Sequence, residues 1–223
     1  MRELAFRDRT DAGVVLADEL TRVLVRPCVV LGIPRGGMAV AFEIAERFRA
    51  PLGVAYARKV VLAVRPELAV GAIDEDGHLL VDHDALHALG GDPQALAEAR
   101  RIAALEITRE RELYDTPSLT PWFAQRAVVL VDDGLATGLT MRAAAAWAHR
   151  HGARELLAAV PVASLDAAAR LEREVGRVVC PWVDEDFDAV GAYFRDFAQV
   201  SDEEVIALLA RARGWAPALP ARS

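Results

Sequence analysis

Short apolar runs alternate with segments of helical periodicity along this chain, and glycine, proline or charged residues separate them. The apolar runs are continuous and rich in valine, which is typical of strands that are buried on both faces. Strands are predicted for the segments CVVLGIP, PLGVAYARKV, RAVVLV, ELLAAVPVA and RVVCPWV. Helices are predicted for residues 11–25, for RGGMAVAFEIAERF after its glycine turn, and for residues 93–114, 140–151 and 164–175. Alternating strands and helices predict an α/β fold, with a parallel sheet that is flanked by helices and joined by right-handed crossovers.

The middle of the chain departs from this alternation. The second strand is predicted to begin at about Leu52 and to end on Arg58 and Lys59, with a loop over residues 60–67. The segment LAVGAIDEDGHLLVD has two apolar stretches around an Asp-Gly pair, a pattern that predicts a β-hairpin. The last residues, 214–223, are expected to fray.

Composition restricts the kind of protein that this chain can be. With 223 residues, of which 53% are hydrophobic, it is long enough for one α/β domain and short for two. The net charge of −7 argues against a broad basic face for nucleic acid or anionic lipid, and no apolar run is long enough to span a bilayer. The first residues are not followed by a signal-peptide core, so we expect a cytoplasmic protein that binds neither nucleic acid nor membrane. Cys28 and Cys180 are expected to be buried, reduced thiols, and the five histidines show no spacing typical of a metal site.

Residues that suit anion binding follow three of the predicted strands. The segment GIPRGG ends the first strand, Arg58 and Lys59 end the second, and DDGLATGLT ends the third. Ligands of parallel α/β sheets bind at the carboxyl ends of the strands. We therefore expect these three segments to converge on one site.

The third strand end has the most specific pattern. Four apolar residues precede Asp132 and Asp133, and the glycine- and threonine-rich turn Gly134–Thr140 leads into an alanine-rich helix. Free backbone N–H groups at a helix N-terminus form a receptor for phosphate, although no Lys-Ser/Thr pair makes this a Walker A loop. The two carboxylates would repel that phosphate, so they are better suited to sugar hydroxyls or to a Mg²⁺ ion shared with the ligand. The pattern indicates a sugar phosphate, but an acid pair that only caps the following helix would use the same residues, and the residues alone leave both interpretations open.

The segment VVLVDDGLATGLT, residues 128–140, resembles without a gap the phosphoribosyl pyrophosphate signature of the type I phosphoribosyltransferase family. The resemblance implies that Asp132 and Asp133 bind the ribose hydroxyls and, through the ligand, a Mg²⁺ cofactor. It also implies that the following loop binds the 5-phosphate through its N–H groups and its threonine hydroxyls. The residues of that loop are Gly134, Leu135, Ala136, Thr137, Gly138, Leu139 and Thr140.

The same resemblance places the first two strand ends at the pyrophosphate. Arg35, Gly36 and Gly37 would form a pyrophosphate loop, in which the family often has a non-proline cis peptide. Arg58 and Lys59 would be further cationic partners of the diphosphate, with Lys59 slightly ahead of Arg58.

Two further segments gain expected roles from the resemblance. Residues 60 to about 84 correspond to the family's mobile loop, which excludes water from an oxocarbenium-like ribose. The segment VDEDFDAVGAYFRDF resembles the hood of hypoxanthine-type members more faintly, and the candidate base-binding residues are Trp182, Phe187 and Val190. Those members have an acid where this chain has Ala136, and LATG is closer to the adenine-type loop. The pattern as a whole also resembles a little-characterised bacterial subgroup, which brings no agreed acceptor.

We therefore expect one phosphoribosyltransferase-like domain over residues 1–223, with a core at about 27–182 and a hood formed mainly by 183–213 with the N-terminal segment. The expected activity is Mg²⁺-dependent transfer of the 5-phosphoribosyl group from phosphoribosyl pyrophosphate to a nucleobase-like nitrogen acceptor, with release of pyrophosphate, by a homodimer. The candidate catalytic residues are Arg35, Lys59, Asp132 and Asp133. Two alternatives stay open: a non-catalytic sensor of phosphoribosyl pyrophosphate, and hydrolysis of a phosphoribosyl compound with water as acceptor.

Overall fold

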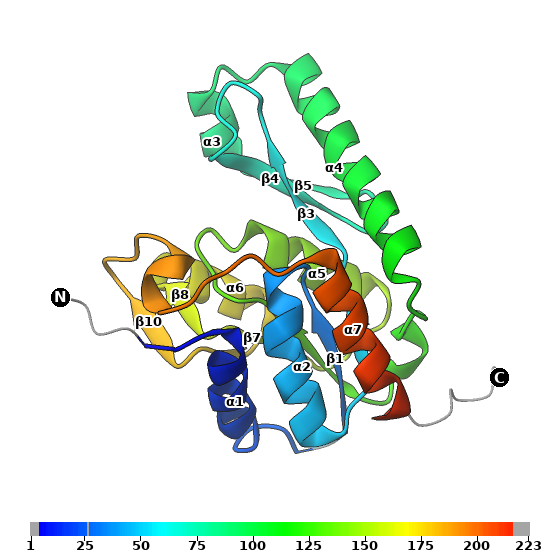
Figure 1. Cartoon of the computed structure of the whole chain (residues 1–223). Coiled ribbons are helices and arrows are strands. Elements are labelled where there is room, and N and C mark those ends of the chain that lie inside the picture. The colour runs from blue at the N-terminus through cyan, green and yellow to red at the C-terminus, as the bar shows by residue number, and fades with distance from the viewer. Residues whose placement is uncertain (1–4, 26, 216–223) are drawn as a thin grey trace.

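Five short parallel strands form the central sheet of the computed structural model, which describes residues 5–25 and 27–215 (Figure 1). In spatial order they are β2 (Leu52–Val54), β1 (Cys28–Gly32), β6 (Ala127–Val131), β7 (Leu156–Ala159) and β9 (Val178–Val179). Every residue of β1 and of β6 is buried, as expected for central strands covered on both faces. The predicted α/β fold with a parallel, helix-flanked sheet is confirmed.

Helices pack on both faces of this sheet. One face is covered by α1 (Arg9–Leu20), α2 (Gly36–Phe48) and α7 (Asp202–Ala212), and the other by α5 (Leu139–Arg150) and α6 (Leu165–Val175). Successive strand residues alternate between the two apolar layers, with Val30 and Val129 in the first and Leu31 and Leu130 in the second. The first predicted helix is correct in kind, but α1 ends at Leu20 and does not extend to residue 25.

A separate antiparallel sheet stands above the core and, with two helices, forms an arm (residues 57–114; Figure 1). Its elements are β3 (Ala57–Val61), β4 (Ala69–Asp74), β5 (Leu79–Val81), α3 (His83–Ala88) and α4 (Pro93–Tyr114). The predicted hairpin is confirmed as β4 and β5, and its turn places Gly77 at a φ of +80°.

The predicted second strand is wrong in its extent, because the chain leaves the central sheet after β2. Arg58 and Lys59 lie in β3, which pairs with β4 and belongs to the arm. Val60 and Val61, predicted as loop, continue that strand. The segment from 60 to 84, expected as a loop, holds the end of β3, all of β4 and β5, and the start of α3, with a turn at 62–68.

The fourth and fifth predicted strands each break into two. β8 (Val162–Ser164) and β10 (Trp182–Asp184) leave the central sheet and pair with each other. A proline lies at each break, Pro161 in the first case and Pro181 in the second, and proline has no N–H to continue a ladder. The remaining short helices are η1 (Thr120–Trp122), η2 (Val190–Tyr193) and η3 (Arg213–Trp215).

Other expectations from the sequence have mixed outcomes. Both cysteines are free, but only Cys28 is buried; Cys180 is partly exposed. Of the tail expected to fray, Gly214 and Trp215 belong to η3, and residues 216–223 lie outside the described part. Among the described helices, none combines the length and the apolar character needed to cross a membrane.

Candidate functional site

A cavity of about 430 Å³ lies where the three predicted strand ends meet. Pro34 lines it from the loop after β1 and Gly36 from the start of α2, Arg58 and Lys59 line it from β3, and the turn after β6 lines it from Asp132 onwards. The expected convergence of these segments is therefore present, although the second group arrives from the arm and not from the core sheet.

Most of the residues singled out in the sequence lie around this cavity. Those that line it are Gly36, Arg58, Lys59, Asp132, Asp133, Gly134, Leu135, Ala136, Thr137, Gly138, Thr140 and Val190. Those that do not line it are Arg35, Gly37, Leu139, Trp182 and Phe187. The remaining lining residues, which were not individual candidates, are Ile33 and Pro34 of the segment GIPRGG, and Ala57, Val61 and Met141.

The turn after the acid pair presents unpaired backbone donors to the cavity. Within the described residues, no acceptor is found for the N–H groups of Ala136, Thr137 and Gly138. Gly138 has a φ of +74° and precedes α5 without a side-chain cap, so the first turn of that helix stays open. Donors of this kind at a helix N-terminus attract a phosphate or another anion.

The two carboxylates beside this turn have different surroundings. Arg9 Nε donates a hydrogen bond to Asp133 Oδ2 at 2.8 Å, and Arg9 Nη2 forms an ion pair with the same oxygen at 2.8 Å. Asp132 Oδ1 accepts the backbone N–H of Asp133 at 2.9 Å, and no ion pair to Asp132 is found in the described part of the chain. Burial, and after it the negative charge of Asp133, raises the pKa of the Asp132 carboxyl well above its ordinary range. One acid is thus neutralised by a cation and the other is not.

Arg9 is a charged residue of the site that sequence reasoning missed. It is the first residue of α1, and it contacts an acid that follows it by 124 positions. No local pattern marks it, because its neighbours Arg7 and Asp8 are equally polar.

The two cations of β3 also differ. Arg58 Nη2 lies 2.5 Å from Glu110 Oε1 and 3.6 Å from Glu106 Oε2, so α4 holds its guanidinium. Glu110 is fully buried, and burial raises the pKa of its carboxyl in spite of the arginine. Lys59 has no ion pair within residues 5–25 and 27–215, and its side chain is exposed at the cavity. Of these two cations, Lys59 is therefore the one whose side chain no ion pair holds in the described residues, and its charge acts to lower the pKa of the Asp132 carboxyl.

The loop after β1 has the expected cis peptide, between Pro34 and Arg35. Arg35 nevertheless does not line the cavity. Its Nη1 lies 3.9 Å from Oδ1 of Asp202, which is the first residue of α7. A Cβ at Gly37 would approach the carbonyl oxygen of Val131 to 2.7 Å, so this glycine allows α2 to pack against the end of β6.

Of the candidate base-binding residues, only Val190 reaches the cavity. A Cβ at Gly134 would lie 2.5 Å from Val190 Cγ1, which shows how closely the two residues pack. Phe187 stacks on Tyr193 at a ring distance of 5.4 Å, and Trp182 is 41% exposed on β10.

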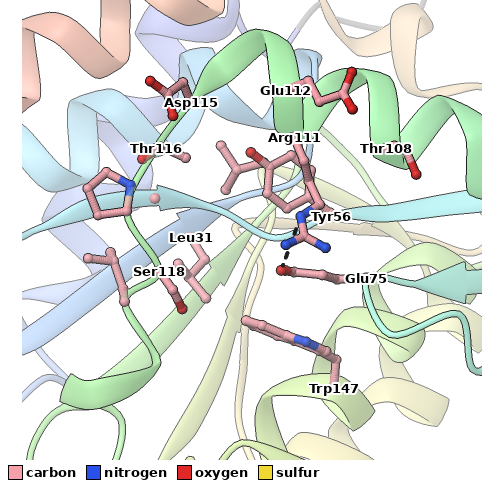
Figure 2. Close-up of a pocket in the computed structure, with 14 residues that line it drawn as sticks. Leu31, Tyr56, Glu75, Thr108, Arg111, Glu112, Asp115, Thr116, Ser118 and Trp147 are labelled. Atoms are coloured by element: carbon pink, nitrogen blue, oxygen red, sulfur yellow. Dashed lines mark ion pairs between the residues drawn. The ribbon is translucent and has the colours of Figure 1, made fainter.

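A second cavity, of about 450 Å³, lies beside the outer edge of β2 and under the C-terminal end of α4. Figure 2 shows Arg111 and Glu75 paired within it, close to Tyr56; their nearest atoms are 3.6 Å apart. Glu112 and Asp115 also line this cavity, so its carboxylates outnumber its single guanidinium. That balance disfavours a phosphate, whereas the first cavity offers free N–H groups and a free lysine.

Three side chains on the hairpin are close enough together to ligate a metal ion, although the sequence showed no histidine spacing typical of a metal site. Asp74, Asp76 and His78 have ligand atoms within 4.8 Å of one another. Arg150 contacts Asp74, however, and His151 Nε2 lies 3.0 Å from Asp76 Oδ2. None of the three lines the first cavity, so this group has no place in the candidate site.

Comparison with known proteins gives sequence matches over most of the chain. Residues 16–193 match the sequence model of the phosphoribosyl transferase domain. Two Mycobacterium tuberculosis proteins, Rv0571c and MT0597, are provisionally named phosphoribosyl transferases and are each 41% identical over 207 residues. The match covers 93% of this chain and 47% of each relative, so the chain spans about half the length of the curated relatives it matches.

Solved structures agree on the fold. The protein TT1426 from Thermus thermophilus is 41% identical and superposes with a TM-score of 0.75, over 97% of this chain and 100% of that one. AQ2163 from Aquifex aeolicus is 14% identical with a TM-score of 0.50, over 82% of this chain and 78% of that one, and it supports the fold alone.

Proposed function

Because the chain belongs to the phosphoribosyl transferase family, we propose that it transfers a 5-phosphoribosyl group from phosphoribosyl pyrophosphate to a nitrogen of a small heterocyclic acceptor, releasing pyrophosphate. The observation that supports this most strongly is the turn of unpaired N–H groups at the start of α5, beside two carboxylates in one cavity.

The residues of the cavity divide naturally between the parts of this substrate. The N–H groups of Ala136, Thr137 and Gly138, with the hydroxyls of Thr137 and Thr140, would bind the 5-phosphate. Asp132 and Asp133 would accept hydrogen bonds from the two ribose hydroxyls, since carboxylates are acceptors and repel phosphate. This assignment explains why acids lie beside an anion-binding turn.

The pyrophosphate would lie toward the loop after β1 and toward Lys59. Gly36 would allow close approach of the backbone there, and the lysine would supply a positive charge that is not held in an ion pair within the described residues. Arg35 reaches the same group only when its side chain leaves Asp202. Cations at this position would stabilise the negative charge that develops on the leaving group.

The two acids could hold a magnesium ion together with the substrate, because each of them keeps one open carboxylate oxygen. Asp133 Oδ2 is held by Arg9, and Asp132 Oδ1 is held by a backbone N–H, which leaves one oxygen on each acid. Mg²⁺ commonly binds through one or two carboxylates together with substrate phosphates and water, and Asp132 and Asp133 meet that requirement. When bound with the substrate, the ion would add positive charge at the pyrophosphate.

The proposed chemistry requires no protein nucleophile. As the bond from the anomeric carbon to pyrophosphate breaks, the ribose gains oxocarbenium character, and the acceptor nitrogen attacks the same carbon. The chain's own contribution is to bind both ends of the ribose and to keep water out. Val61 and Met141 line the cavity, and Val190 packs against Gly134, so apolar groups would flank the sugar in the proposed complex.

Calorimetric titration with phosphoribosyl pyrophosphate, with and without MgCl₂, tests the proposal. Binding that strengthens with magnesium is expected, followed by release of pyrophosphate when the right heterocycle is added. Absence of heat at roughly millimolar ligand, a concentration far above the Kd of a specific site, would reject phosphoribosyl pyrophosphate as the substrate.

A further inference from the structure

The Arg9 side chain contacts both the acid pair of the site and the C-terminal part of the chain. Its Nε donates to Asp133 Oδ2 at 2.8 Å, its Nη2 forms an ion pair with the same oxygen at 2.8 Å, and its Nη1 donates to the carbonyl oxygen of Ala198 at 2.7 Å. Its guanidinium carbon lies 3.8 Å from the centre of the Phe197 ring. Only 11% of the side chain is exposed. A planar, fully engaged guanidinium fixes the orientation of a carboxylate far more tightly than a flexible ammonium can.

The contact leaves Asp133 with one committed oxygen and one open oxygen. Both donors of Arg9 converge on Oδ2, and no described residue donates to Oδ1. Gly36 makes this arrangement possible, because a Cβ there would overlap Asp133 Oδ2 and press on Arg9 Nε. The open oxygen belongs to a residue that lines the cavity, and it is the one available to a sugar hydroxyl.

Arg9 also joins the acid to the segment 190–198, which we call the hood segment. The backbone just before Arg9 pairs with this segment: Arg195 N–H donates to the carbonyl oxygen of Phe6 at 3.0 Å, and Asp196 N–H donates to that of Arg7 at 2.8 Å. At its other end the hood segment packs Val190 against Gly134 at the cavity. The arginine is thus the charged link between the N-terminal segment, the hood segment and the ribose acids.

We propose that Arg9 is a positioning residue that orients Asp133 for a ribose hydroxyl and fastens the hood segment over the site. The orientation of Asp133 for a ribose hydroxyl rests on the proposed function, whereas the fastening of the hood segment concerns the protein without ligand. Because the cation cancels one of two adjacent negative charges, it also lowers the repulsion that a phosphorylated ligand meets at the acid pair.

The fastening of the hood segment is tested without any ligand. Amide hydrogen exchange of residues 190–198 is measured by mass spectrometry in the full chain, in Arg9→Gln and in Arg9→Lys. Arg7→Gln is the matched control, because Arg7 lies two residues before Arg9 in the N-terminal segment. Its side chain is 70% exposed and pairs only with Asp11 among the described residues. Exchange of 190–198 is expected to be fastest in Arg9→Gln and intermediate in Arg9→Lys, and to be unchanged in Arg7→Gln. Exchange equal to that of Arg7→Gln would overturn the fastening role.

The positioning of Asp133 is tested with phosphoribosyl pyrophosphate and MgCl₂ by calorimetry. Arg9→Gln is expected to bind roughly 10- to 100-fold more weakly than the parent, and Arg7→Gln to bind equally. Arg9→Lys should recover only part of the loss, because an ammonium lacks the planar fork that fixes the carboxylate. Methylguanidine should restore part of the affinity of Arg9→Ala, a rescue that a general folding defect would not give.

The outcomes separate the two proposals. A parent protein that does not bind the ligand at all rejects the proposed function and, with it, the ribose role of Arg9, while the exchange experiment still decides the fastening role. A parent that binds, together with an Arg9→Gln variant of equal affinity, overturns the positioning role alone. Circular dichroism and thermal melting identify a variant that has not folded, and Arg9→Lys then supplies the comparison.

Discussion

Replacing Asp132 by asparagine is expected to stabilise the protein near neutral pH and at the same time to abolish its affinity for phosphoribosyl pyrophosphate. The pKa of the Asp132 carboxyl is raised by burial first and by Asp133 second, and no cation pairs with it among the described residues. Asparagine has nearly the same shape and keeps the Oδ1 that accepts the N–H of Asp133. The substitution therefore removes the unfavourable charge and little else.

The direction of the pH effect follows from the raised pKa. A carboxyl whose pKa is higher in the folded protein than its ordinary value of 3.8 favours folding while it is protonated, and this contribution is lost as the pH rises through the raised value. Above that pH the folded state holds a charge that it disfavours. Removing one such charge should contribute about 1 kcal/mol, which for a chain of this size raises the Tm by about 2–4 °C. The gain should shrink as the pH falls toward about 4, where the parent carboxyl is itself protonated.

Thermal unfolding followed by calorimetry across this pH range measures the effect, and ligand titration measures the loss of binding. Asp188→Asn is the control for a change of net charge, since the Asp188 side chain is exposed and does not line the cavity. A lower Tm for Asp132→Asn than for the parent at about pH 8 would refute the electrostatic reasoning. Retained affinity would refute the role of this acid in binding the ribose.

Three further substitutions probe other parts of the site. Asp133→Asn should have the opposite effect on stability from Asp132→Asn, because it leaves the nearly buried Arg9 without its anion and costs roughly 1–3 kcal/mol, measurable as a lower Tm. Lys59→Gln should weaken phosphoribosyl pyrophosphate binding roughly tenfold and reduce its salt dependence with an unchanged Tm; affinity equal to the parent's at low salt would remove this lysine from the site. Gly36→Ala should abolish binding, because its Cβ would overlap the carboxylate of Asp133, whereas Gly214→Ala, where nothing lies within 4 Å, should bind normally in the same titration.

The core of the fold could be predicted because burial on both faces leaves a strong local signal. β1 and β6 are uninterrupted apolar runs, and each of their residues is covered. The segments that follow them carry the phosphate-binding chemistry, so once the strands were located, their convergence at one edge followed from parallel topology.

Pairing partners had no such local signal. The run ending in Arg58 and Lys59 looks like the end of a core strand, yet these residues pair with Ile73 and Ala72 of β4. The choice between two sheets depends on contacts with β4 and α4, and one of these contacts is the hydrogen bond from Arg58 to the fully buried Glu110. The strand break at Pro161 was readable in principle, because a proline cannot donate to a ladder.

The acid pair shows most clearly what a motif can and cannot specify. In the sequence, Asp132 and Asp133 have the same apparent role, because the two are adjacent and identical. The structure separates them: one oxygen of Asp133 is held by Arg9, while Asp132 has only a backbone N–H and a raised pKa. Two full negative charges beside a phosphate-binding turn would oppose the ligand, and a fully neutralised pair would offer no strong acceptor for hydroxyls. With one charge matched by a cation from a distant helix, the pair retains an open acceptor on each acid at a lower electrostatic cost, and that compromise depends on a residue outside the motif.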